Sequence, residues 1–402
     1  MSIPPAPALA SVDWTPTRAA GLARLAAFLP AAGGDYARDR NVDRGPADRA
    51  NVSCLSPWIR RRLITEEEVI AAVLARHRLQ SAEKFIQEVF WRSYWKGWLE
   101  MRPGVLTHFD AERQTLRASW AGDAALLRAM EGRTGIACFD AWVRELVDIG
   151  WLHNHARMWF ASIWIFTLRL PWPLGADFFY KHLVDADPAS NTLSWRWVAG
   201  LHTTGKHYLA RATNIRDHTL GRFDPGGQLA EQALPLREET PAPVPAALPG
   251  GSQVTERRVA LLLTEEDLHP ESWDLTADVA GCAALESPRV AAATSPAARF
   301  SSGALADGLA RAGTHFSTGT ALLEAGRVTA WAKGLGVTEL ATGFAPTGLV
   351  AWSLDRLQHA LAQDGIRLVQ LQRGFDRRVW PHARAGFFKL REKIPQLVSP
   401  AP

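Results

Sequence analysis

Apolar residues recur at helical spacing along the first half of the chain. In seven segments, apolar positions fall three and four residues apart, which predicts amphipathic helices. These segments are residues 19–29, 66–79, 82–99, 124–130, 139–149, 153–170 and 176–183. Short turns containing Gly, Pro and Asp separate them. The pattern therefore predicts an almost entirely helical domain, which we place at residues 1–224.

The pattern changes after residue 224. Residues 225–256 contain six prolines among scattered charges, which is typical of a semi-extended linker. Beyond the linker, short apolar runs predict strands at 259–263, 290–293, 338–343 and 366–371, with helices at 304–311 and 349–362 between them. Strands that alternate with helices predict an open, Rossmann-like and mostly parallel α/β sheet. We assign it to a smaller C-terminal domain, residues 257–402.

Composition agrees with a soluble protein of two domains. Of the 402 residues, 47% are apolar and 21% are charged. The three cysteines have no short C-x-x-C spacing, so we expect neither disulfides nor a zinc site. This cysteine usage also leads us to expect a cytoplasmic location. The first eleven residues do not resemble a signal peptide, and no apolar run has membrane-spanning length. We expect a monomer with no membrane partner.

Charge and tryptophan are unevenly distributed. Residues 1–225 hold 28 Lys/Arg against 23 Asp/Glu, whereas the remainder holds 17 against 18. This excess of cations suits an anionic partner, although a similar excess also keeps ordinary proteins in solution. Thirteen of the 17 tryptophans precede residue 200. Indoles therefore have a use in the first region beyond ordinary core packing.

Two stretches of the helical region place polar groups beside apolar ones. The turn 51–58 offers two serine hydroxyls and several backbone N–H groups before a helix, which suits a diphosphate or simply a helix start with proline. Further on, Glu88, Trp91, Arg92 and Trp95 share one face of a helix. A purely structural helix rarely directs an acid and a base onto its aromatic side.

A third and a fourth stretch are denser in polar groups. In residues 150–159, Asn154 and Met158 share a helical face, with Arg157 beside them. Downstream, Asp185, Asp187 and Asn191 precede the run Trp195-Arg196-Trp197. His153 and His155 fit a pair of helix-surface histidines, and we predict no metal site because no carboxylate pattern accompanies them.

Taken in order, these motifs resemble the FAD domain of the photolyase/cryptochrome family over residues 15–224. The resemblance rests on Tyr36, Ser53-Cys54-Leu55-Ser56-Pro57, Glu88-Val89-Phe90-Trp91-Arg92, Glu131-Gly132-Arg133-Thr134-Gly135, Gly150-Trp151-Leu152-His153-Asn154, Arg157-Met158, Asp185-Ala186-Asp187 and Asn191. It implies a mainly helical fold. The family's N-terminal α/β antenna domain is absent from its usual place.

The resemblance implies a site for FAD, active as FADH−. The cofactor-binding residues would be Tyr36, Ser53, Leu55, Ser56, Glu88, Arg92, Asn154, Arg157, Asp185, Asp187 and Asn191. In the family, the serine turn holds the diphosphate, and an arginine paired with an aspartate, here Arg157 with Asp185, lies near the flavin ring. Asn191 matches the residue that faces flavin N5. An antenna pigment cannot be assigned.

The resemblance also implies a pocket for a flipped-out cyclobutane pyrimidine dimer. Its substrate-binding residues would be Glu88, Trp91, Asn154, His155, Met158 and Trp197. Family members that act on (6-4) photoproducts carry histidines at the positions of Asn154 and Met158, which favours the cyclobutane dimer here. Trp195, Trp172 and Trp120 match the family's chain of indoles for electron transfer to the flavin, although each alone would pass for a core residue.

The implied activity is light-dependent repair of dimers in UV-damaged DNA, a carbon–carbon lyase reaction driven by an electron from excited FADH−. Glu88 would stabilise the dimer radical anion as an acid with a raised pKa. Two alternatives stay open, a cryptochrome-like blue-light photoreceptor and a flavin-stabilised nucleic-acid-binding protein without repair activity.

The chain departs from the family at Val52, His155 and Thr167. His155 replaces an arginine that usually contacts DNA, so we expect weaker duplex binding and possible action on single strands. Polar and basic side chains after Trp197 could contact phosphates instead. They are Thr203, Thr204, Lys206, Arg211 and Arg216.

Overall fold

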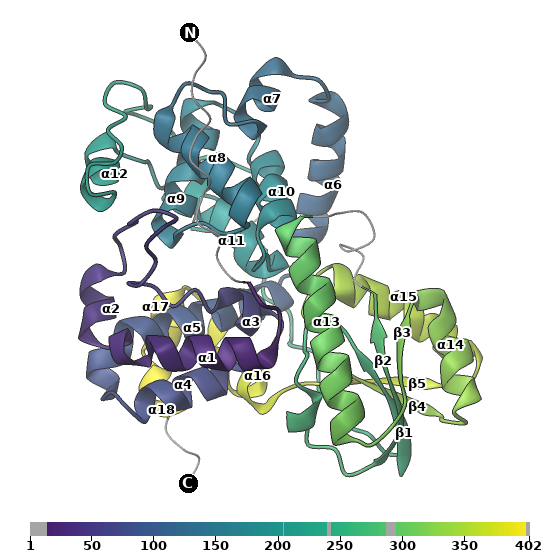
Figure 1. The fold of residues 1–402 in the computed structure, drawn as a ribbon. Coiled ribbons are helices and arrows are strands. Elements are labelled where there is room, and N and C mark those ends of the chain that lie inside the picture. The colour runs from purple at the N-terminus through teal and green to yellow at the C-terminus, as the bar shows by residue number, and fades with distance from the viewer. Residues whose placement is uncertain (1–13, 204, 239–242, 287–294, 399–402) are drawn as a thin grey trace.

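The computed structural model describes residues 14–203, 205–238, 243–286 and 295–398. Within these residues, the first region is helical and the second contains a sheet (Figure 1). The helices of the first region are α1 (Arg18–Phe28), α2 (Gly34–Asp39), α3 (Ser56–Arg60), α4 (Glu66–Leu74), α5 (Leu79–Glu100), α6 (Gly104–Ser119), α7 (Ala124–Met130), α8 (Ala137–Ile149), α9 (Asn154–Ser162), α10 (Trp172–His182), α11 (Pro188–Ala199) and α12 (Ala212–His218).

Two predicted helices have different limits in the structure. The predicted helix 66–79 ends at Leu74, because Arg78 takes an extended backbone and starts the longer helix α5. The predicted helix 153–170 is an α-helix only from Asn154 to Ser162, and Ile163–Thr167 form a π-helical turn. Such π turns are frequent beside functional sites.

Some helices of the first region were not predicted. Helix α6 buries only Val105, Leu106 and Phe109 along its sixteen residues, so few apolar positions mark its buried face. Asp187 is the N-cap of helix α11, and its carboxylate accepts a hydrogen bond from the Ser190 backbone N–H at 2.8 Å. Pro188 is the first residue of the helix. These local start signals are present in the sequence, but the apolar period of α11 is interrupted by the polar residues of its cavity face.

The second region holds a five-stranded sheet whose described strand pairs are all parallel, in the order β3-β2-β1-β4-β5. Its strands are β1 (Arg258–Leu263), β2 (Asp278–Leu285), β3 (Thr320–Leu323), β4 (Glu339–Gly343) and β5 (Arg367–Leu371). Its helices are α13 (Pro296–His315), α14 (Ala325–Gly334) and α15 (Leu349–Gln363). The predicted fold class, a helical domain with a parallel α/β sheet, is confirmed.

The two faces of the sheet bury different cores. Alternate residues of β1, Val259, Leu261 and Leu263, join the main core together with α13, whereas Ala260 and Leu262 face a smaller core under α14 and α15. Figure 1 shows α13 crossing one face of the sheet, with α14 and α15 beyond the strands. One face of the sheet therefore shares its core with the helical region.

Strands β1, β4 and β5 match predicted strands, whereas the predicted strand 290–293 lies outside the described residues. Strands β2 and β3 were missed. Strand β2 is rich in alanine and glycine, which are weak strand formers, and β3 has only four residues. In both strands parallel pairing to neighbours, rather than local preference, determines the structure.

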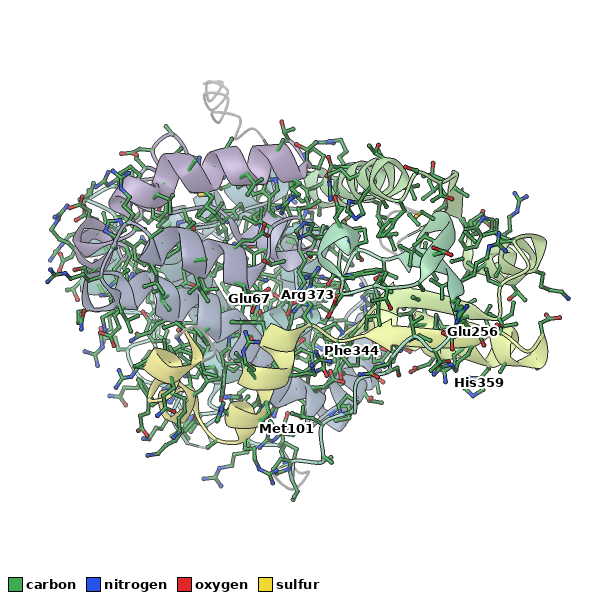
Figure 2. All side chains as sticks on the ribbon, turned by 90° about the horizontal axis from the view of Figure 1, so that it is seen from below. Glu67, Met101, Glu256, Phe344, His359 and Arg373 are labelled. Atoms are coloured by element: carbon green, nitrogen blue, oxygen red, sulfur yellow. The ribbon has the colours of Figure 1, made fainter. Side chains whose placement is uncertain are left out.

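After β5 the chain returns to the helical region. Helices α16 (Gly374–Val379) and α17 (Phe387–Arg391), with the 3₁₀ turn Trp380–Arg384 between them, pack on α5, and α18 (Ile394–Leu397) follows them. Figure 2 shows this yellow segment on the opposite side of the helical region from the purple α1. Gly97 of α5 permits this approach, because a Cβ there would lie 2.9 Å from Cα of Trp380. The boundaries 1–224, 225–256 and 257–402 stay a prediction, but these last helices pack on the first region.

Buried ion pairs also join the two regions. Arg60 donates two hydrogen bonds of 2.7 Å to Glu266, which follows β1, and Arg62 donates to both oxygens of Asp376 at 2.6–2.7 Å. All four side chains are almost fully buried. Near them, Arg373 binds Asp267, and Figure 2 shows Arg373 between the helices and the sheet.

The described residues of the predicted linker form neither helix nor strand. They lie against the helical region, since the Leu236 N–H donates to Ala199 O at 2.9 Å and the Ala246 N–H donates to Met101 O at 2.8 Å. Within the described chain, every helix is too short or too polar to span a bilayer.

Candidate functional site

A cavity of about 540 Å³ lies within the helical region, and twelve of the predicted site residues line it. They are Glu88, Trp91, Arg92, Asn154, His155, Arg157, Met158, Asp185, Asp187, Asn191, Trp195 and Trp197. The volume falls in the usual range for pockets that hold cofactors and other small molecules. The structure thus brings together residues that are spread over more than a hundred positions of the sequence.

Three helices build the wall, each with one face. Helix α5 contributes Glu88, Trp91, Arg92 and Trp95, at steps of three and four residues. Helix α9 contributes its residues 154, 157, 158 and 161 in the same way, and α11 contributes 190, 191, 194, 195 and 198. Polar side chains occur on these faces because they border the cavity and not the core.

The floor of the cavity, defined here as Arg157, Asp185 and Asp187, contains fixed charges, and its two aspartates are buried while Arg157 is partly exposed. Arg157 donates hydrogen bonds of 3.1 and 2.9 Å to the two oxygens of Asp185. Burial alone would raise the pKa of Asp185, but the charge and hydrogen bonds of Arg157, the charge of Arg92 and a hydrogen bond from Ser56 together outweigh it, and the pKa is lowered. Bidentate pairing also fixes the orientation of both groups.

The pKa of Asp187 is lowered as well. Burial opposes its charge, yet Lys96 at 3.4 Å and Arg60 at 3.7 Å hold its pKa well below the usual range. Lys96 also lies 3.9 Å from Glu266. The floor is therefore connected, through Lys96 and Arg60, to the ion pairs that join the sheet to the helical region.

Several buried polar atoms of the wall have no hydrogen-bond partner among the described residues. They are Nη1 of Arg92, Oγ of Ser190 and Nε1 of Trp195. Asn191 is different, because its Nδ2 donates to Ala176 O at 2.8 Å and leaves Oδ1 as an acceptor. Unsatisfied buried donors are costly, which indicates that a polar ligand completes this wall.

The mouth of the cavity is defined here as Arg40, Glu88, Trp91 and Phe388. The carboxylate of Glu88 has different surroundings from the aspartates of the floor. Glu88 forms an ion pair with Arg40, and about a third of its side chain, 32%, is exposed. Burial raises the pKa of Glu88, and the positive charges of Arg40 and Lys84 only partly offset this. Glu88 thus retains its proton to a higher pH than an ordinary glutamate.

Tyr36 lies behind the mouth and is not part of the wall. Its ring is buried edge-on against Phe28 and Phe85, at centroid distances of 6.0 and 5.2 Å. Burial raises the pKa of its hydroxyl, which is hydrogen-bonded to Arg40. Tyr36 therefore positions the cation that pairs with Glu88.

The predicted phosphate turn lies next to the floor and outside the wall of the cavity, with Ser53 and Ser56 partly buried and Leu55 buried. Trp151 Nε1 donates to Ser56 Oγ at 3.3 Å, and Ser56 is hydrogen-bonded to Asp185. Three arginines surround the turn, since Arg24, Arg49 and Arg157 all act on the thiol of Cys54. Cations and hydroxyls in this arrangement suit a diphosphate.

The two histidines of α9 are not a surface pair. His153 is buried and caps the helix, because its Nδ1 accepts from the His155 N–H at 3.2 Å. Burial lowers the pKa of His153 to about 4. His155 borders the cavity, stacks on Trp159 at 4.9 Å and contacts Asn41 O through Nδ1 at 2.8 Å; burial lowers its pKa as well.

The three predicted relay tryptophans lie on three helices that pack in succession, α11, α10 and α6. Trp195 is in the cavity wall and is buried. Trp172 is buried against Phe109 at a centroid distance of 5.3 Å, and Trp120 is partly buried at the end of α6. The ring pairs formed by Trp195 itself are with Phe179, Trp164 and Phe160, so electron transfer through Trp172 and Trp120 stays a prediction.

Several residues of the site could not be identified from the sequence. Arg24 and Arg49 are isolated arginines there, and Phe388 is far along the chain in the predicted α/β domain. One feature of the sequence could have indicated the ion pairs around Arg60 and Lys96. The basic run Arg60-Arg61-Arg62 is matched by an acidic run, Glu265-Glu266-Asp267. Of the predicted phosphate contacts, Lys206, Arg211 and Arg216 are exposed, and Thr204 lies outside the described residues.

Comparisons with known proteins agree with this geometry. Residues 85–253 match the family model for the FAD-binding domain of DNA photolyase. The chain is 29% identical to the deoxyribodipyrimidine photo-lyase of Escherichia coli over 231 residues, 56% of this chain and 48% of that protein. It is 34% identical to the photo-lyase of Thermus thermophilus over 228 residues, 55% and 51% of the two chains.

Among solved structures, a class III photolyase from Agrobacterium tumefaciens aligns with a TM-score of 0.42 and 30% identity, over 51% of this chain and 43% of that one. The chain spans about half the length of the curated relatives it matches.

Proposed function

Through its helical region the chain belongs to the photolyase/cryptochrome family, and we propose that it binds FAD in the cavity and repairs cyclobutane pyrimidine dimers in DNA under light. One observation carries the proposal. The residues that the family resemblance assigns to flavin and dimer, although scattered along the sequence, line a single cavity of about 540 Å³. The enzyme would act as a lyase on carbon–carbon bonds of UV-damaged DNA.

The wall is suited to FAD by its donors and charges. Nη1 of Arg92, Oγ of Ser190 and Nε1 of Trp195 are buried without partners in the described chain, and a flavin offers carbonyl oxygens and ring nitrogens to such groups. The serine turn and its arginines would hold the diphosphate. When bound, the cofactor supplies light absorption and electron transfer, and the protein supplies binding, orientation and electrostatics.

The floor would stabilise a reduced flavin. The pair Arg157–Asp185 would border the ring, with both groups fixed by their two hydrogen bonds. The free Oδ1 of Asn191 would accept a hydrogen bond from a ligand N–H, because its Nδ2 is already held by Ala176 O. The reduced form of a flavin carries such an N–H at N5, so an acceptor there favours it.

The mouth would hold the dimer. Trp91 and Trp197 would provide apolar walls for bases that have left the helical stack, and Asn154 and Met158 would face them. Glu88 would donate a hydrogen bond to the dimer when its carboxyl is protonated, a form that burial favours by raising its pKa. A proton on the carboxyl group of Glu88 would stabilise negative charge on the dimer during bond breaking.

We further propose that single-stranded DNA is the preferred substrate. At the position of the usual DNA-binding arginine, His155 is stacked on Trp159 and its pKa is lowered, so it would add no positive charge at neutral pH. Without that contact, duplex binding weakens. Single- and double-stranded oligonucleotides with one dimer each provide the comparison, and equal repair of both would contradict this preference.

Illumination of the reduced protein with dimer-containing oligo(dT) tests the main proposal. The flavin is first photoreduced and its reduction is followed by absorbance, and the dimer content is then measured by chromatography of the DNA. We expect dimers to disappear in the light and to persist in the dark. If the flavin is reduced but the dimers persist in the light, the repair function is wrong, and a photoreceptor function becomes the better explanation.

A further inference from the structure

One wall residue of the cavity comes from the C-terminal helices. All other residues of the wall fall between Arg40 and Val198, whereas Phe388 belongs to α17. The side chain of Phe388 is 66% exposed although it borders the cavity. Its ring therefore lies at the mouth, where a bound strand would pass.

The segment that carries Phe388 is fixed to α5, the helix of Glu88 and Trp91. Phe387 is buried and stacks on Trp91, with a centroid distance of 3.7 Å and an interplanar angle of 13°. The Tyr94 hydroxyl donates to Ala385 O at 3.0 Å. These contacts determine where the neighbouring ring of Phe388 stands relative to the mouth.

A second hydrogen bond and the surrounding charges reinforce this arrangement. Arg102 Nη2 donates to Arg384 O at 2.7 Å. The guanidinium of Arg391 lies 5.1 Å from the centroid of the Phe388 ring. Residues 384–393 expose four cations, Arg384, Lys389, Arg391 and Lys393, against one anion, Glu392.

A single exposed aromatic residue on a protein surface needs no explanation. Phe388 differs because it continues the aromatic lining of a cavity and is flanked by cations. Proteins that bind single-stranded nucleic acids combine the same two elements, since bases stack on aromatic rings and phosphates are attracted by nearby Lys and Arg.

We propose that Phe388 stacks on the unpaired base next to the dimer, and that Lys389 and Arg391 bind the adjacent phosphates. The inference rests on the proposed function, because a dimer in the cavity is what brings the strand to the mouth. In a duplex the neighbouring base is already stacked and paired, and freeing it costs energy. The C-terminal segment therefore contributes to a preference for single strands.

A fluorescent base analogue tests this directly. The probe is single-stranded oligo(dT) with one dimer and a 2-aminopurine beside it. Stacking on Phe388 quenches the 2-aminopurine, and Phe388→Ala should abolish that quenching and raise Kd about tenfold, as expected for the loss of one stacked base. Phe388→Trp should restore both. Leu322→Ala, which truncates another exposed apolar side chain, 58% exposed on β3, is the control and should behave as wild type.

The phosphate contacts are tested by salt dependence. The double variant Lys389→Gln, Arg391→Gln should reduce the slope of log Kd against log salt by about 1.4, from two lost contacts to a single strand. Flavin content should be equal in all variants.

Two outcomes separate the inference from the function beneath it. If the wild type repairs dimers and Phe388→Ala keeps both its Kd and its quenching, the role of Phe388 is wrong and the proposed function stands. If the wild type holds flavin but neither binds nor repairs the dimer, the proposed function fails, and the inference fails with it.

Discussion

The floor and the mouth of the cavity treat their carboxyl groups in opposite ways. At the floor, Asp185 and Asp187 are almost fully buried, and neighbouring cations lower the pKa of both. At the mouth, Glu88 is about a third exposed and paired with Arg40, yet its pKa is raised. Burial acts on all three groups in the same direction, so the outcome depends on whether the neighbouring charges and hydrogen bonds together outweigh it.

This difference divides the chemistry of the site. The charge of a carboxylate with a lowered pKa does not vary with pH near neutrality. Such a charge suits the binding of a cofactor that must be kept in one redox state. A carboxyl group that keeps its proton suits a substrate on which negative charge develops. Under the proposed function, one cavity would stabilise a reduced flavin at its floor and donate a hydrogen bond at its mouth.

The largest expected effect concerns the ion pairs behind the floor. Replacing Arg60 with Met leaves Glu266 and Asp187 buried with only Lys96 between them. Removing one partner from a buried ion pair costs about 3–5 kcal/mol, so we expect the free energy of unfolding to fall by about 4 kcal/mol and flavin to be lost. Urea unfolding and flavin content per protein measure this.

Arg378→Met is a matched control for Arg60→Met. Arg378 also pairs with a glutamate of the other region, Glu67 at 2.5 Å, but both side chains are about half exposed. An exposed pair contributes about 0–1 kcal/mol. Equal losses of stability in the two variants would contradict the view that the buried pairs hold the sheet to the helical region.

A smaller effect is expected at the floor itself. Asp185→Asn keeps the shape of the side chain but removes the charge opposite Arg157. Hydrogen bonds to charged groups contribute about 1.5–3 kcal/mol, so the variant should lose about 2 kcal/mol of stability and bind FAD more weakly. Titration of the apoprotein with FAD measures the second effect. If Asp185→Asn binds FAD as tightly as the wild type, the floor is not the flavin site.

The part of the site that lies on single helices could be predicted from the sequence. Glu88, Trp91 and Arg92 occupy one helical face whatever the rest of the chain does, because the period of the helix sets their directions. The convergence of three such faces on one cavity followed from the family resemblance and not from spacing. Helix packing depends on contacts between side chains that no local pattern specifies.

The contacts between the two regions could not be predicted from the sequence for the same reason. Arg60 and Glu266 are 206 residues apart, and charge runs such as theirs are usually exposed to solvent. Phe388 was assigned to the predicted α/β domain, yet its helix lies on α5. In both cases a later part of the chain packs against the helical region, after β1 for Glu266 and after β5 for Phe388, and this packing has no signature in periodicity.

The opposite pKa shifts predict opposite dependences on pH. For the aspartates, whose pKa values are lowered in the fold, the stabilising contribution is present above the ordinary range near 3.9 and is lost as the pH falls through the lowered values. For Glu88, whose pKa is raised, the contribution is present below the ordinary range near 4.3 and is lost as the pH rises through its raised value.

Flavin retention should therefore fail only in acid, whereas dimer affinity should decline as the pH rises past the raised pKa of Glu88. Glu88→Gln keeps a hydrogen-bond donor without a titrating proton, so it should flatten the pH profile of dimer binding and leave flavin content unchanged. Fluorescence anisotropy with a labelled dimer oligonucleotide gives the profile. A decline that persists in Glu88→Gln would assign the titration to another group.

The smallest effect on stability is expected at the outer end of the predicted relay. Trp120 is only partly buried at the end of α6, so Trp120→Phe should change the free energy of unfolding by about 0.5 kcal/mol or less. It should nevertheless slow photoreduction of the bound flavin in the presence of an external reductant, because the last donor of the chain is missing. Trp331→Phe, on α14 of the sheet region, is the control and should be reduced at the wild-type rate.

If the flavin is photoreduced at equal rates in Trp120→Phe and the wild type, the predicted path of the electron is wrong, but the proposed role of the cavity is unaffected. Trp195 has Trp164 as a ring neighbour at a centroid distance of 6.2 Å, and Trp91 and Trp95 in the same wall are 5.1 Å apart. Trp164→Phe and Trp95→Phe would then identify which indole contact carries the electron. Since neither residue contributes a charge to the floor or the mouth, such a result would separate the path of the electron from the two kinds of carboxyl group that are proposed to bind flavin and dimer.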